Sequence, residues 1–144
     1  MTPFIQGQVP YQPIPVGIAR DPQCKCWAVS SIFGVPSIAW YDDDGLPLLP
    51  GPIGKGPVFG GGLIGTFNPL GLAFAPDGTL FFIDVHLEIG AGGIGPGAAS
   101  GALYQVTFTD GVPGVPTKIA DGLDYPVSVT TCSPARQICP APRR

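Results

Sequence analysis

Apolar and polar side chains alternate over short stretches with the period of a β-strand. From residue 103 to residue 109 two sets of side chains point in turn to opposite sides, as in a strand that is buried on one face. Residues 70–75 and 79–84 are further β-prone runs. Pro76-Asp77-Gly78 between them combines a fixed φ with a residue that tolerates positive φ, which predicts a hairpin. Helical periodicity free of Gly and Pro is missing, so the predicted fold class is all-β.

The same order of elements occurs more than once along the chain. Residues 15–22 (PVGIARDP) recur as 69–76 (PLGLAFAP), and this match places Cys26-Trp27 over Leu80-Phe81. A weaker third copy begins at Pro126. Residues 40–47 correspond to 106–113, and 59–63 parallel 119–123, so the extra residues of the second copy form an insertion at 85–100. Each unit is predicted to hold four strands.

This pattern indicates a repeat architecture. Four strands per unit at a period of about 40–50 residues is typical of a β-propeller blade. Residues 68–84 (NPLGLAFAPDGTLFFID), followed by 101–106 (GALYQV), resemble the NHL-type blade of the gluconolactonase/strictosidine-synthase-like propellers and the soluble quinoprotein sugar dehydrogenases. The resemblance covers 68–131 well and 14–50 loosely. It implies a partial β-propeller of about two four-stranded antiparallel blades plus the start of a third.

The expected organisation follows from these copies. We predict an N-terminal arm (1–13), repeat one (14–67), repeat two with its insertion (68–125), and the start of a third repeat with a C-terminal tail (126–144). Propellers close with 4–8 blades, and a blade cannot bury its faces alone. Three explanations stay open: a fragment of a longer protein, a ring of several copies, or a stack covered by other partners. Other blades or protein partners, including further copies of this chain, are therefore expected.

Composition narrows the class of protein. Gly (22) and Pro (19) are abundant among the 144 residues, but 44% of the residues are hydrophobic and only 12% are charged, which argues against disorder. A net charge of −3 without a basic face argues against nucleic-acid binding. Residues 56–76 are uncharged yet rich in Gly and Pro, so no membrane span is expected. The first residues lack the pattern of a signal peptide, whereas four cysteines in a lysine-poor chain favour a secreted or periplasmic protein.

The cysteines are interpreted as structural. Cys132 and Cys139 flank a short turn and are predicted to form a disulfide, while the pairing of Cys24 and Cys26 stays open. These spacings differ from the C-x2-C of zinc sites, so no metal site is predicted from cysteine.

The candidate ligand-binding residues gather around the only histidine. His86 follows Asp84 at a strand end, Glu88 lies nearby, and Asn68 precedes an innermost strand. A base or ligand set is one interpretation, and a solvated loop histidine is the other. Two further segments are given structural roles. The run 42–45 (DDDG) lacks the alternation of a calcium loop and is predicted to be a turn, and 90–97 is predicted to be a flexible or partner-ordered loop.

The predicted function is a non-catalytic propeller repeat module for protein or ligand binding, without a catalytic residue or cofactor. The alternative is a fragment of a propeller enzyme, either a metal-dependent lactonase-like hydrolase or a quinoprotein sugar dehydrogenase, with calcium as the alternative cofactor. The lactonase-like relatives imply a divalent ion held by carboxylate and Asn side chains, for which only Asn68 and Glu88 are of the right types. The quinoprotein relatives imply a histidine base, for which only His86 is available.

Overall fold

The fold is known from a computed structural model that describes residues 15–32, 37–48, 68–90, 93–110 and 112–132. Within these ranges the regular structure consists of antiparallel strands without a helix, which confirms the all-β prediction. No helix there is long and apolar enough to cross a membrane. The strands are β1 (Pro15–Arg20), β2 (Trp27–Ser31), β3 (Ser37–Tyr41), β4 (Pro69–Phe74), β5 (Leu80–Asp84), β6 (Leu87–Gly90), β7 (Gly93–Pro96), β8 (Gly101–Val106), β9 (Phe108–Thr109), β10 (Val112–Pro113) and β11 (Thr117–Leu123).

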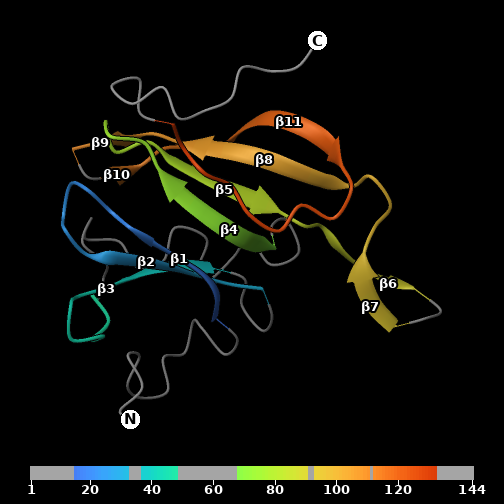
Figure 1. The fold of residues 1–144 in the computed structure, drawn as a ribbon, viewed down its shortest axis with the longest axis horizontal. Helices are drawn as coiled ribbons and strands as arrows, with labels where there is room; N and C mark the ends of the chain where they lie inside the picture. The colour runs from blue at the N-terminus through green and yellow to red at the C-terminus, as the bar shows by residue number, and fades with distance from the viewer. Residues whose placement is uncertain (1–14, 33–36, 49–67, 91–92, 111, 133–144) are drawn as a thin grey trace.

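Two larger sheets dominate the described chain. The first sheet has the order β1-β2-β3, and the second has the order β11-β8-β5-β4. In Figure 1 the two sheets lie side by side with β1 next to β4, which are the first strands of the two predicted repeats. The strand order in each sheet follows the chain order, as expected for hairpins joined in succession.

The predicted hairpin between β4 and β5 is confirmed. The N–H of Ala75 donates to the carbonyl oxygen of Thr79 over 2.9 Å, and the Asp77 carboxylate accepts the N–H of Thr79 over 2.9 Å. Gly78 has a φ of 89°, which is the conformation for which glycine was expected at this position. The carboxylate bonds to the backbone lower the pKa of Asp77, because they favour its charged form.

The sequence alignment that placed Cys26 over Leu80 is wrong. After the β1–β2 turn, the two copies are shifted by one residue relative to that alignment. Arg20 pairs with Trp27 across the β1–β2 turn, and Phe74 pairs with Leu80 across the β4–β5 turn. The first turn therefore holds six residues (21–26) and the second only five (75–79). Trp27, rather than Cys26, occupies the place of Leu80.

The main core lies between the two sheets. Side chains from β2, β3, β4, β5 and β8 meet there, and the largest of them are fully buried. A smaller cluster occupies the opposite face of the first sheet, where Trp27 packs against Val29, Ala39 and Tyr41. The members of the main core are Cys26, Ala28, Ile38 and Trp40 from the first sheet side and Leu72, Leu80, Phe82 and Val106 from the second.

The insertion at 85–100 differs from the expected loop. Its residues form a β-hairpin in which β6 pairs with β7, and Figure 1 shows this hairpin extending away from the end of the second sheet. Leu87 and Ile89 alternate along β6, and Ile94 of β7 lies opposite Ile89. Glycines weaken strands, but their backbone groups still form a ladder when a turn brings two runs together.

Candidate functional site

The structure brings the predicted ligand-binding residues together at one end of the second sheet. Asp84 ends β5, and Asn68 directly precedes β4, which pairs with β5 through Pro69 opposite Asp84. His86 and Glu88 follow at the base of the β6–β7 hairpin. Antiparallel pairing therefore explains why residues 16–20 positions apart in sequence meet here.

Hydrogen bonds in this cluster hold the backbone. Asp84 is 3% exposed, and its Oδ1 accepts the N–H groups of Asn68 over 2.8 Å and His86 over 2.9 Å. The Oδ1 of Asn68 accepts the N–H of Leu87 over 2.9 Å. A buried carboxylate needs such partners, because an unpaired buried charge is costly. These two side chains tie the start of β4 to the end of β5 and to the inserted hairpin.

His86 and Glu88 are the exposed part of the cluster. The Nε2 of His86 lies 3.8 Å from the Oε1 of Glu88, and about half of each side chain is exposed. His86 has a φ of 47°, an uncommon value for a residue other than glycine, although histidine adopts it more often than most. The pair could bind a polar partner at the foot of the β6–β7 hairpin.

A second cluster surrounds the β1–β2 turn and contains the two cysteines whose pairing the sequence did not determine. Cys24 and Cys26 form a disulfide with their Cα atoms 5.2 Å apart. A carboxylate oxygen of Asp21 and the Sγ atoms of both cysteines all lie within 4.8 Å of one another. Cys132 is also disulfide-bonded, whereas Cys139 lies outside the described residues.

The Asp42–Gly45 run forms the predicted turn. The Asp42 carboxylate accepts the N–H groups of Asp44 over 3.0 Å and Leu46 over 2.8 Å, and Gly45 has a φ of 76°. Such Asp-to-backbone bonds are typical of turns. The turn also projects Asp43 toward the first sheet.

Asp43 belongs to a polar cluster that sequence reasoning missed. Arg20 donates to both of its carboxylate oxygens, and Trp27 Nε1 donates to Oδ1 over 2.9 Å. The Arg20 guanidinium also lies 4.7 Å from the centre of a Trp27 ring, a cation–π arrangement. The hydrogen bond from Arg20, followed by that from Trp27, lowers the pKa of the Asp43 carboxyl.

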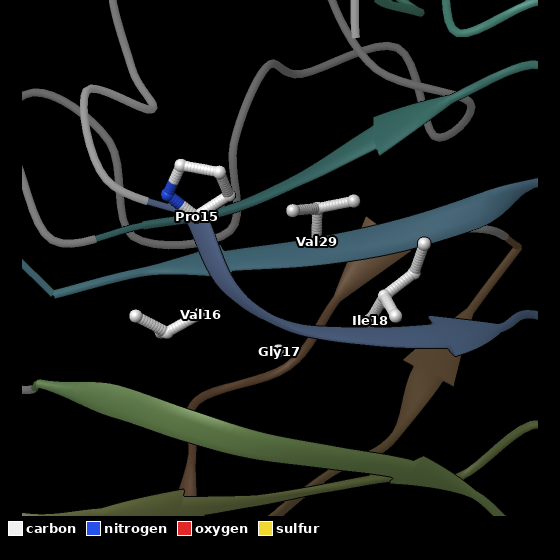
Figure 2. Close-up of a pocket in the computed structure, with 5 residues that line it drawn as sticks. All are labelled: Pro15, Val16, Gly17, Ile18 and Val29. Carbon is white, nitrogen blue, oxygen red and sulfur yellow. The ribbon is translucent and has the colours of Figure 1, made fainter. Parts of the chain in front are cut away.

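The face of the first sheet that points away from the main core is partly open. A hollow of about 230 Å³ is lined by Pro15, Val16, Gly17, Ile18 and Val29. Figure 2 shows these side chains along β1 and on the neighbouring strand β2. Ile18 is 54% exposed, whereas Leu72, which occupies the same place in the second sheet, is 8% exposed.

One contact between neighbouring elements is repeated. A Cβ added to Gly17 would overlap the carbonyl oxygen of Leu70 on β4. A Cβ added to Gly71, the counterpart of Gly17, would lie 2.7 Å from Ser128 Cα and 2.9 Å from the Val127 carbonyl oxygen. The first strand of each copy thus lies against the first residues of the next, with space only for glycine.

A buried serine strengthens the first of these contacts. Ser30 Oγ on β2 donates to the Leu70 carbonyl oxygen over 2.8 Å, so this oxygen is satisfied across the sheet boundary. The third copy is bound in a related way, because Thr131 Oγ1 donates to the Phe74 carbonyl oxygen over 2.8 Å. The invariant spacing of Gly17 and Gly71 within their copies was the available sequence signal. No sequence signal pointed to Ser30 or Thr131.

Comparison with known proteins adds no assignment at this site. No protein-family model, curated protein or solved structure matches the chain.

Proposed function

We propose that this chain is a non-catalytic β-propeller repeat module whose open end face binds a further blade, either from the same polypeptide or from another protein. The observation that carries the proposal is the repeated glycine contact. Gly17 faces Leu70 of the next copy, and Gly71 faces Val127 and Ser128 of the copy after that. Radial repetition of one inter-sheet contact is what successive propeller blades require.

The chemistry of the open face agrees with this role. In the second sheet, Leu72 belongs to the main core, together with Ala28 of the first sheet and Cys26 of the β1–β2 turn. In the first sheet the corresponding Ile18 is 54% exposed, with Val16 beside it also exposed. An exposed apolar patch at a repeat boundary is typical of an interaction surface. The occupant that fits is a sheet with small residues on its inner strand.

The polar cluster around Asp84 supports a scaffolding role better than a catalytic one. Asn68 Oδ1 and Asp84 Oδ1 accept backbone N–H groups, so their hydrogen bonds fix strand ends. His86 and Glu88 lie at the base of the β6–β7 hairpin, and about half of each side chain is exposed. The disulfide bonds of the chain favour an exported protein in an oxidising compartment.

Light scattering coupled to size exclusion tests the proposal. The chain has a mass of 14.8 kDa, and a docking face predicts either self-association or binding of an apolar dye. Ile18→Asp should reduce both, because it places a charge on the open face. Ile94→Asp is the matched control, since Ile94 is 59% exposed on the distant β6–β7 hairpin. A monomer that binds no dye, or equal effects of the two substitutions, would contradict the proposal.

A further inference from the structure

The Cys24–Cys26 disulfide closes an unusually small ring. The two cysteines enclose a single residue, Lys25, within the β1–β2 turn. A disulfide stabilises a protein mainly by restricting the unfolded chain, and the effect is smallest for short loops. This disulfide is therefore a poor staple for the fold, and its presence calls for another explanation.

The two cysteine residues differ in their access to solvent. Cys24 is exposed, whereas Cys26 is 3% exposed and belongs to the main core. Thiol–disulfide exchange depends on access of an incoming thiolate to one of the sulfurs. Attack is therefore expected at Cys24, with Cys26 as the leaving sulfur.

The turn is held by bonds that do not involve the sulfurs. The N–H of Asp21 donates to the Cys26 carbonyl oxygen over 2.9 Å, and the N–H of Lys25 donates to the Asp21 carbonyl oxygen over 3.0 Å. The Asp21 carboxylate accepts Trp40 Nε1 over 3.0 Å and the N–H of Gln23 over 2.9 Å. This network would survive reduction, so the hairpin can keep its shape as a dithiol.

Lys25 adds a reason for lability. Its φ is 56°, in the left-handed region that residues other than glycine rarely adopt. Breaking the disulfide would release the chain from one constraint that keeps Lys25 in this conformation.

We propose that Cys24–Cys26 is a thiol–disulfide exchange site that accepts electrons from low-molecular-mass thiols or exposed protein thiols. An incoming thiolate attacks Cys24 Sγ and forms a mixed disulfide. The bond to Cys26 Sγ breaks, and this sulfur leaves with the electron pair and takes a proton from water.

A second thiolate completes the exchange. It attacks the external sulfur of the mixed disulfide, and Cys24 leaves and is protonated. In total two external thiols are oxidised to one disulfide, while the protein disulfide is reduced to a dithiol. This chemistry is independent of the proposed propeller assembly, because it needs only the β1–β2 turn.

Glutathione is the probe for the experiment. The folded wild-type chain is incubated in buffers of graded reduced-to-oxidised glutathione ratio, quenched with acid, alkylated and mapped by mass spectrometry. The Cys132 disulfide in the same molecule is the internal control. We expect Cys24–Cys26 to be reduced at a ratio at least tenfold less reducing than Cys132 requires, with an unchanged near-ultraviolet circular dichroism spectrum. The trapped adduct should lie on Cys24.

Single variants test the direction of attack. In Cys26→Ser, oxidised glutathione should form an adduct on Cys24 quickly. In Cys24→Ser, the adduct on Cys26 should form at least tenfold more slowly, because that sulfur is buried. The proposal is overturned if Cys24–Cys26 stays oxidised until the chain unfolds, if it is reduced together with Cys132, or if the wild-type adduct lies on Cys26.

Discussion

The first sheet has three described strands and the second has four, and the corresponding faces of the two sheets are very different. At corresponding places the second sheet has Leu72 and Phe74, which pack into or against the main core. The first sheet has Ile18, which is 54% exposed, and Arg20, which stacks over Trp27 and pairs with Asp43. One sheet has a neighbour on that face among the described residues, and the other does not.

The comparison shows how the two copies divide their faces. Gly17 and Gly71, on the first strands of the two copies, lie against the first residues of the copy that follows. On the opposite face, Leu72 packs into the main core, whereas Ile18 is exposed. Close packing of backbone against backbone needs the glycine, while the apolar face supplies the buried area. The Arg20–Asp43 pair adds a polar contact at the end of β1.

The largest effect is expected for Gly17→Ala. A methyl group at residue 17 would overlap the carbonyl oxygen of Leu70. Because this oxygen belongs to the backbone of β4, the overlap can be relieved only if the two sheets separate. We expect a loss of about 3 kcal/mol in the free energy of unfolding, measured by urea denaturation. Gly95→Ala is the control, because a Cβ at Gly95 meets no atom within 4 Å. Equal stabilities of the two variants would show that the sheets do not pack as described.

Leu72→Ala and Ile18→Ala form a matched pair of truncations. Leu72→Ala should cost about 2.5 kcal/mol, because it leaves a cavity in the main core. Ile18→Ala should cost less than about 1 kcal/mol in the isolated chain, since Ile18 is largely exposed. Denaturation midpoints measure both. A cost of Ile18→Ala that matches the Leu72 value would mean that the face of β1 is already covered in solution.

Asp84→Ala tests the scaffolding role of the polar cluster. Removal of the carboxylate leaves the N–H groups of Asn68 and His86 without this acceptor, with an expected cost of about 2 kcal/mol. His86→Ala should have little effect on stability, because its ring is half exposed. Thermal unfolding compares the two. A stable Asp84→Ala variant would remove the structural interpretation of this cluster.

The last prediction concerns an effect that is absent near neutral pH and involves Tyr41, whose counterpart in the second sheet is Val106. Burial raises the pKa of Tyr41 from 10.0 to about 12, because the phenolate is disfavoured there. The folded state therefore keeps its proton where the unfolded state loses it. This contribution to stability is complete below pH 10 and is lost as the pH rises toward 12. Urea denaturation between pH 9 and 12 measures this loss of stability. The loss should be smaller in Tyr41→Phe than in the wild-type chain. An unchanged slope would contradict the assignment to Tyr41.

Local turn chemistry and strand periodicity made much of the fold predictable. Proline and glycine marked the β4–β5 turn, and alternation marked β8. The register of the first copy was not predictable in the same way. Its turn holds one more residue, and the backbone bonds of Asp21 that accommodate the extra residue leave no clear trace in the sequence. The strands of the insertion were hidden by their glycines.

The candidate site was only half predictable. Asn68, Asp84 and His86 could be grouped because strand ends meet at a sheet edge, but the sequence could not show that two of these side chains bind backbone N–H groups. The open apolar face depends on which residues lie across a sheet boundary, and the Cys24–Cys26 pairing depends on the conformation of the β1–β2 turn. Sequence spacing within one copy does not carry that information.

Nuclear Overhauser effects in the isolated chain test the repeated packing most directly. The account predicts cross-peaks from the Gly17 α-protons to Leu70, and from the Gly71 α-protons to Ser128, since a Cβ at Gly71 would lie 2.7 Å from Ser128 Cα. Both sets should be present together, because both report the same step between successive copies. If the first set is present without the second, or if neither appears, the two sheets are not successive units of one repeat.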